Sequence, residues 1–317
     1  MSLVTVLREP VTDARAWTAA TVGPPDAWHF AVSDDCVSEL RSYLTGLERD
    51  GRPLTEIQVD EALPVCRRAI QPLRAALVSG RGFVVVDGVP MAAGDRDVAR
   101  TVYWLLGQLI GEPFEQDIEG TLLYDVRDTG ESVTTGSRFS ATNAESSFHT
   151  DNAFGPRLPD IVGLLCLQTA KSGGQSQLLS AHSVHNALLR YSPDVLETLY
   201  GPFLFDRRGQ IADGESPVSE HPVFHWDGRE LTQRYMHYYI EVGHHRLQRP
   251  LTREQTSALD ALQSVLREPD LRVEFELQRG QMLFTNNRWI LHNRTAFEDS
   301  EDVDQRRHYL RLWLSLD

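Results

Sequence analysis

Three residues of the chain have the types and the spacing of a metal-binding set. His149 and Asp151 form an H-x-D triplet, and His292 lies much further along the sequence. Two imidazoles and one carboxylate are the facial set that holds Fe(II) and leaves the remaining coordination positions open. Side chains at positions i and i+2 of a strand point to the same face. We therefore expect residues 149–151 to form a strand on which both side chains reach one metal ion.

Two arginines follow His292 near the end of the chain. Arg307 offers a planar pair of donors that matches a carboxylate. Arg311 lies four residues further on, on the same face of a predicted strand. An H-x-D triplet by itself is weak evidence, and a distant second histidine adds little because the chain contains 11 histidines. The interpretation depends on the ordered combination of these residues.

The pattern of apolar residues predicts the architecture that must position them. Residues 1–80 are expected to form a helical N-terminal extension, and residues from about 82 to 317 a core of many short strands with added helices. Such a pattern suggests a jelly roll. No linker divides the sequence, so residues 1–317 are expected to form a single domain. A polar segment near 113–147, with one or two strands, is interpreted as a lid-like loop before the metal motif.

Individual elements follow from apolar spacing and from turn residues. Strands are predicted over 83–86, 161–168, parts of 203–242, 271–277, 281–285, 289–292 and 306–316. Helices are predicted over 64–78, 95–110, 183–190, 193–200 and 252–267, the last with Thr252 as its N-cap. His244 and His245 are interpreted as part of a solvated turn, because adjacent strand residues face opposite ways.

The charge and the cysteines exclude several classes of protein. A formal net charge of −14 argues against a nucleic-acid-binding protein and against attraction to anionic membranes. No signal peptide or membrane span is visible. Cys36, Cys66 and Cys166 are odd in number and widely spaced, so neither a disulfide framework nor a zinc site is expected. These observations suit a reducing cytoplasm, and the sequence predicts no particular oligomeric state.

Four motifs in order make the chain resemble the taurine dioxygenase and clavaminate synthase superfamily of Fe(II)/2-oxoglutarate oxygenases. The motifs occupy residues 147–151, 173–176, 287–297 and 306–311. The resemblance extends from about Gly82 to Leu316. It implies a mainly β fold with flanking helices around a double-stranded β-helix core of the jelly-roll, cupin-like type. It also implies a 2-oxoglutarate-dependent dioxygenase that uses Fe(II), 2-oxoglutarate and O2.

The resemblance implies roles for individual residues at the metal and at the co-substrate. His149, Asp151 and His292 match the iron ligands of the family. Arg307 matches the arginine that pairs with the C5 carboxylate of 2-oxoglutarate. Ser176 stands where the family usually has a threonine, whose hydroxyl helps to bind the same carboxylate.

Other residues are implied to contact the substrate. Arg311 matches a second arginine, which contacts either the co-substrate or an anionic group of the substrate. Asn143 and Glu145 precede the iron motif in a region that often faces the substrate, and Phe148 adjoins the first ligand. The motif at residues 293–297 does not resemble the taurine-specific version, so taurine is not the expected substrate.

The implied reaction is hydroxylation of an unactivated carbon of a small metabolite, with release of succinate and CO2; an anionic or amino-acid-like substrate is one option. Asp151 favours hydroxylation over halogenation, because related halogenases have a small residue at this position. Desaturation, epoxidation and cyclisation in natural-product biosynthesis use the same ligands and stay open. From the residues alone, two alternatives remain: a zinc hydrolase with the same ligand set, and a non-catalytic binding protein.

Overall fold

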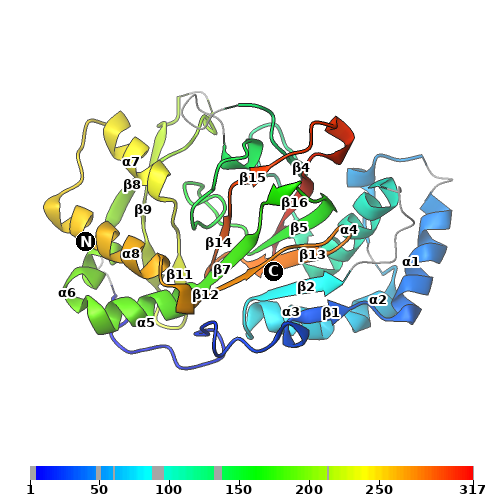
Figure 1. Cartoon of the computed structure of the whole chain (residues 1–317), viewed down its shortest axis with the longest axis horizontal. Coiled ribbons are helices and arrows are strands. Elements are labelled where there is room, and N and C mark those ends of the chain that lie inside the picture. The colour runs from blue at the N-terminus through cyan, green and yellow to red at the C-terminus, as the bar shows by residue number, and fades with distance from the viewer. Residues whose placement is uncertain are drawn as a thin grey trace.

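The centre of the molecule is a seven-stranded sheet, seen in a computed structural model that describes residues 5–47, 51–59, 61–87, 96–131, 138–212 and 214–316 (Figure 1). Its order is β1-β2-β13-β5-β16-β3, with β4 also beside β16. Only β1 and β2 pair in parallel. The bounds are β1 (His29–Ala31), β2 (Phe83–Asp87), β13 (Met282–Asn286), β5 (Ile161–Gln168), β16 (His308–Ser315), β3 (Glu112–Pro113) and β4 (Leu123–Val126).

A smaller, antiparallel sheet carries the distal histidine. Its order is β12 (Arg272–Phe275), β7 (Ser176–Ser180) and β14 (Ile290–Arg294), and its register sets His292 opposite Leu178. In Figure 1 this sheet lies between the large sheet and the helices α5 and α8. Val85 and Leu283 of the large sheet belong to the same buried cluster as Leu178 and Leu291 of the small one.

The remaining elements flank these two sheets. Three strand pairs complete the β structure: β6 (Ser172–Gly173) with β15 (Phe297–Glu298), β8 (Pro202–Asp206) with β9 (Val218–Pro222), and β10 (Phe224–Trp226) with β11 (Leu231–Gln233). The α-helices are α1 (Asp34–Leu47), α2 (Pro64–Ala69), α3 (Gln71–Val78), α4 (Arg96–Ile110), α5 (Ala181–Tyr191), α6 (Pro193–Leu196), α7 (His237–Arg246) and α8 (Arg253–Leu266). The 3-10 helices are η1 (Pro25–Ala27), η2 (Leu54–Glu56), η4 (Phe139–Ala141), η5 (Glu197–Tyr200), η6 (Pro269–Leu271) and η7 (Val303–Gln305).

Side chains of β16 alternate between the outer face of the large sheet, which is packed against helices, and its inner face. Leu310, Leu312 and Leu314 lie in the buried cluster formed with α1 to α4, on the outer face of the large sheet. Successive strand residues point to opposite faces, so Arg311 and Trp313 point to the inner face. The two sheets with helices on their outer faces form the double-stranded β-helix core that the sequence predicts.

Most of the predicted elements are confirmed. The strand at 161–168 has the predicted bounds, and Thr252 caps α8 in a capping box with Gln255. The predicted helix at 64–78 is divided at Ile70 into α2 and α3. The N-terminal region, predicted to be helical, also contributes β1 to the large sheet.

The strand prediction was wrong at the end of segment 203–242, where residues from His237 onwards form α7. Aromatic and β-branched residues in this stretch favour a strand by propensity. Tyr239, Ile240 and Gly243 are buried at helical spacing instead. His244 is therefore buried rather than in a solvated turn, and its ring bonds to the backbone of Leu204 and Arg249.

The expectation of no disulfide was also wrong. Cys36 of α1 and Cys66 of α2 form a disulfide, whereas Cys166 is free and buried. The two partners are far apart in sequence, and only the packing of α1 against α2 brings their Cα atoms within 4.7 Å. Spacing in the sequence carries no information about that packing.

The predicted lid-like loop near 113–147 contains β4 and η4, and residues 132–137 lie outside the described part of the chain. The loop therefore includes a strand of the large sheet, since β4 pairs with β16. Within the described ranges, no helix has the length and apolar character needed to cross a membrane.

Gly243 tests the packing that positions α7. A Cβ added there would lie 2.5 Å from the carbonyl oxygen of Leu204, whereas one at Gly46 in α1 would meet nothing within 4 Å. We expect Gly243→Ala to destabilise the fold by about 1–3 kcal/mol through overpacking, despite the better helix propensity of alanine. Gly46→Ala is the control and should stabilise by up to about 1 kcal/mol. Thermal unfolding measures both, and similar gains in Tm would contradict the close contact of α7 with β8.

Candidate active site

The backbone brings His149 and His292 side by side. The two residues form an isolated antiparallel bridge, in which each N–H donates to the carbonyl oxygen of the other at 3.0 and 2.9 Å. The prediction of a strand over 149–151 was wrong in this respect, because the pairing ends after one bridge and Asp151 begins a turn. The N–H of Thr150 instead donates to the carbonyl oxygen of Tyr235, and its hydroxyl accepts from the N–H of Tyr235.

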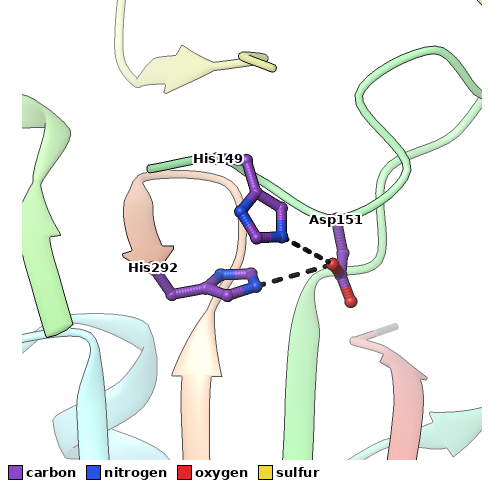
Figure 2. Close-up of side chains that lie close together, drawn as sticks. All are labelled: His149, Asp151 and His292. Atoms are coloured by element: carbon purple, nitrogen blue, oxygen red, sulfur yellow. Dashed lines mark ion pairs between the residues drawn. The ribbon is translucent and has the colours of Figure 1, made fainter. Parts of the chain in front are cut away.

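The three side chains nevertheless converge. The Nε2 atoms of His149 and His292 lie 3.6 and 3.5 Å from Oδ1 of Asp151 (Figure 2). One ligand atom from each residue lies within 4.8 Å of the other two, and no other such group of metal-binding side chains occurs in the described part of the chain. Figure 2 shows both rings directed at the same carboxylate oxygen. The arrangement fits the two-histidine, one-carboxylate facial set that binds Fe(II).

Local structure orients the ligands. The carbonyl oxygen of Ser147 lies 2.8 Å from Nδ1 of His149, and because it can only accept, Nδ1 carries the proton and Nε2 is free to bind a metal. Ser147 and Asn152, on either side of the triplet, have φ of 59° and 55°. Left-handed conformations in residues other than glycine are uncommon and concentrate at functional sites.

The second oxygen of Asp151 is held from the large sheet. Oδ2 accepts a hydrogen bond from Nε1 of Trp313 at 2.8 Å and is 3.2 Å from Nη1 of Arg311. The backbone of Asp151 is fixed by Asn287, whose Oδ1 accepts from its N–H at 2.7 Å and whose Nδ2 donates to its carbonyl at 3.0 Å. One oxygen of this carboxylate therefore lies near the two histidines, and the other contacts side chains of β16.

The charges of the site suit metal binding. Burial raises the pKa of Asp151, but the charge of Arg311 and hydrogen bonds from the two histidines outweigh burial and hold this pKa well below its usual range. Burial and the nearby His149 lower the pKa of His292. An ionised carboxylate and a neutral imidazole are the forms that bind metal.

A cavity opens beside the three ligands. Among the residues that line it are four arginines, Arg138, Arg294, Arg307 and Arg311, and a single carboxylate, Asp151. Apolar and aromatic side chains such as Val162, Leu164 and Tyr239 line other parts of the wall. A wall with this excess of positive charge favours anionic occupants.

Arg307 is a buried cation without a hydrogen-bonding partner for part of its guanidinium. Its exposed fraction is 3%, and within the described part of the chain its Nε and Nη1 have no partner. The guanidinium lies 3.8 Å from the ring centroid of Tyr309 and 5.2 Å from that of Phe297. Burial lowers the pKa of Arg307. Unpaired buried cations are costly, so this geometry fits a site for a carboxylate of a ligand.

Ser176 lies close to this region but not on the cavity wall. It is buried at the start of β7, where its backbone is paired with that of Arg294 on β14. It is not among the described residues that line the cavity. Its predicted contact with 2-oxoglutarate stays a prediction.

The residues predicted to contact the substrate occupy different places. Arg311 lines the cavity. Asn143 and Glu145 are exposed, and Oε1 of Glu145 accepts from Asn293 at 2.9 Å. Phe148 is half-buried and packs against the core cluster that includes Leu178. The last three do not line the cavity within the described ranges, so their roles stay predictions.

Sequence reasoning missed several cavity residues. Trp313 lies two positions after Arg311 on the same strand face, so the strand period was a signal for it. Arg294 follows the distal histidine by two positions on β14 and was detectable in the same way. Arg138 and Ser140 come from the segment around η4, and nothing in their local pattern marks them.

Comparison with known proteins places the chain in a family. Residues 43–313 match the model of the family described as Taurine catabolism dioxygenase TauD, TfdA family. The chain is 28% identical to FR-33289 synthase of Streptomyces rubellomurinus over 99% of this chain and 93% of the relative. It is 29% identical to a uridine-5'-phosphate dioxygenase of a Streptomyces species, over 64% of this chain and 73% of the relative.

Solved structures show the same fold. Asparagine oxygenase, in complex with Fe(II), (2S,3S)-3-hydroxyasparagine and succinate, aligns with a TM-score of 0.67 and 20% identity, over 90% of this chain and 93% of its own. The non-heme iron oxygenase OrfP, in complex with Fe and α-ketoglutaric acid, aligns with a TM-score of 0.62 and 17% identity, over 91% and 94%.

Trp313 tests how the carboxylate is held. We expect Trp313→Phe to remove the indole hydrogen bond to Asp151 and weaken Fe(II) binding by about 10- to 100-fold, the usual effect of losing a group that orients a metal ligand. Trp28→Phe is the matched control, because the buried indole N–H of Trp28 has no hydrogen-bonding partner in the described structure. Anaerobic calorimetric titration with Fe(II) measures both affinities. Equal affinities in Trp313→Phe and wild-type protein would contradict this role.

Proposed function

The chain belongs to the Taurine catabolism dioxygenase TauD, TfdA family, and from that premise we propose that it hydroxylates an unactivated carbon of a small anionic metabolite. The enzyme is a 2-oxoglutarate-dependent dioxygenase, and its cofactors are Fe(II), 2-oxoglutarate and O2. In the proposed reaction one oxygen atom enters the substrate and the other enters succinate, and CO2 is released from 2-oxoglutarate.

We propose roles for the residues at the reacting end of the cavity. His149, Asp151 and His292 would hold the iron, which when bound supplies the redox chemistry that activates O2. Arg307 would hold the distal carboxylate of 2-oxoglutarate and orient its keto acid end toward the metal. Trp313 and Arg311 keep the carboxylate of Asp151 ionised and fixed. Apolar residues such as Val162 and Leu164 would exclude water from the part of the cavity between the metal ligands and Arg307.

One observation supports this function over the zinc hydrolase. The three-ligand cluster opens into a cavity that also contains the buried, incompletely paired guanidinium of Arg307. The chemistry of a metal-bound water does not itself require this cation, whereas a dicarboxylate co-substrate requires a counter-charge away from the metal. The non-catalytic alternative is disfavoured by the same two features.

The anionic character of the substrate is supported by the charge of the cavity. After 2-oxoglutarate has engaged the metal and Arg307, the wall still contains the three arginines Arg138, Arg294 and Arg311 against the single carboxylate of Asp151. A relative named for uridine 5'-phosphate shows that an anionic substrate has precedent among similar proteins. The neighbours solved with hydroxylated asparagine or arginine, at 20% identity or less, support the fold and leave the substrate open.

Arg307 tests the proposed function. Purified protein with Fe(II), ascorbate and air should convert 2-oxoglutarate to succinate slowly without added substrate. We expect Arg307→Gln to raise the KM for 2-oxoglutarate roughly 10- to 100-fold, because it removes a charge-assisted hydrogen bond to the ligand. Arg306→Gln, which alters the exposed neighbouring arginine, should leave the KM unchanged. Failure of wild-type protein to bind or turn over 2-oxoglutarate would refute the proposal.

A further inference from the structure

The active-site cavity contains one carboxylate, and the protein already uses both of its oxygens. Among the described residues that line the cavity, Asp151 is the only acidic one. Its Oδ1 lies beside the two histidines, and its Oδ2 accepts from Trp313 and pairs with Arg311. Residues 132–137, which precede Arg138 in the sequence and lie outside the described part of the chain, contain no aspartate or glutamate. No acidic side chain of the described wall is therefore free to bind a cation of the substrate.

Two arginines of the wall pair with no carboxylate in the described part of the chain. Arg138 and Arg294 donate hydrogen bonds there only to main-chain oxygens, which belong to Gln116, Thr142 and Ala144. Nη2 of Arg138 and Nε of Arg294 are buried and have no partner within the described ranges. Burial and the charge of Arg307 lower the pKa of Arg294 to about 9, and burial and the charge of Arg311 lower the pKa of Arg138. Positive charge is thus crowded in this wall.

The metal and the co-substrate, when bound, do not remove this excess of positive charge. The charges of Fe(II) and Arg307 match those of Asp151 and of the two carboxylates of 2-oxoglutarate. The charges of Arg138, Arg294 and Arg311 therefore stay in excess. Charges in a partly buried cavity interact more strongly than charges in water, and salt screens them less. A substrate with a net negative charge is attracted, whereas a cationic group on that substrate is repelled.

The neutral hydroxyl groups of the wall offer little to a cation. The hydroxyl oxygens of Ser146 and Thr150 already accept from backbone N–H groups, each at 3.0 Å. Among the described residues that line the cavity, this leaves the hydroxyls of Ser140 and Tyr239. A primary ammonium group has three N–H donors and loses its hydration when it is buried. Two neutral hydroxyls beside several guanidinium groups do not compensate for that loss.

We propose that the substrate is an organic anion without a free amino group, in which any nitrogen is uncharged, as in an amide. A free amino acid carries an ammonium group that this wall repels. An amide or alkyl group in the same place adds no charge and suits apolar side chains of the wall such as Phe139 and Met236. This inference rests on the proposed function, because it concerns the substrate of that reaction. It excludes free amino acids, which the sequence leaves open.

Matched probes test this by equilibrium binding to protein loaded anaerobically with Fe(II) and 2-oxoglutarate. One series is phosphoethanolamine, ethyl phosphate and N-acetylphosphoethanolamine, and the other is 4-aminobutyrate, butyrate and N-acetyl-4-aminobutyrate. We expect at least one series to bind, with its amine about tenfold or more weaker than the other two members, because only the amine brings a positive charge to the arginines. Calorimetry measures each Kd, and the acetylated member controls for size. An amine that binds as tightly as its acetylated counterpart, or no binding by any probe, would overturn the inference.

Arg138→Glu tests the origin of this preference, because it places a carboxylate in the wall. We expect it to reduce the preference for the acetylated probe over the amine by about tenfold or more, since an attractive charge replaces a repulsive one. Arg138→Gln removes only the repulsion and should reduce the preference by less. Arg127→Glu is the matched control: it makes the same change of charge at an exposed arginine next to β4 and should keep the wild-type preference. An unchanged preference in both Arg138 variants would overturn the inference.

Succinate formation from 2-oxoglutarate without any probe separates this inference from the proposed function. Wild-type protein that forms succinate but binds the amines as tightly as the acetylated probes would overturn only the inference about the substrate. Protein that neither binds 2-oxoglutarate nor forms succinate would refute the proposed function itself.

Discussion

The site depends on the two-sided contact of one buried carboxylate. Oδ1 of Asp151 faces both histidines, while Oδ2 is held by Trp313 and Arg311. A buried charge is tolerated only when it is paired and hydrogen-bonded. Two side chains of β16, two positions apart, contact one oxygen of this carboxylate. The backbone bridge between His149 and His292 holds the two imidazoles beside the other oxygen. The pairing of β16 with β5 in the large sheet therefore sets the geometry of the ligands.

β16 also joins the metal ligands to the cavity wall, because its Arg311 lines the cavity and pairs with Asp151. Nη1 of Arg311 lies 3.2 Å from Oδ2 of Asp151, its Nε donates to Gln116, and its Nη2 has no hydrogen-bonding partner in the described part of the chain. Buried guanidinium nitrogens without partners cost stability, and ligands that bind only the folded state would offset that cost. Natural proteins commonly carry such local costs at functional sites.

Much of the fold, and the H-x-D half of the three-residue cluster, could be predicted because their signals are local. The H-x-D triplet, the nearly continuous apolar run of residues 161–168 and the capping box of Thr252 with Gln255 each span only a few positions of the sequence. The convergence of His292 on the triplet was predictable only through the order of the motifs, because no local pattern joins residues so far apart.

What escaped prediction depends on contacts between distant segments. The disulfide of Cys36 and Cys66 requires α1 to pack on α2, and the helix α7 overrides a strand-like composition because its buried face packs on β8. Arg138 reaches the cavity from the segment around η4, and its partner Gln116 from a different loop. Such residues are identified by position in space, since their sequence neighbourhood resembles an ordinary polar loop.

The most direct test of the metal site is the visible absorption of Fe(II) protein on addition of 2-oxoglutarate under nitrogen. Chelation of the keto acid to iron held by two histidines and one carboxylate gives a metal-to-ligand charge-transfer band. We predict this band in wild-type protein and in His225→Ala, which alters an exposed histidine, and its loss in His292→Ala. A band of unchanged intensity in His292→Ala, or none in wild-type protein, would contradict the assignment of the iron ligands.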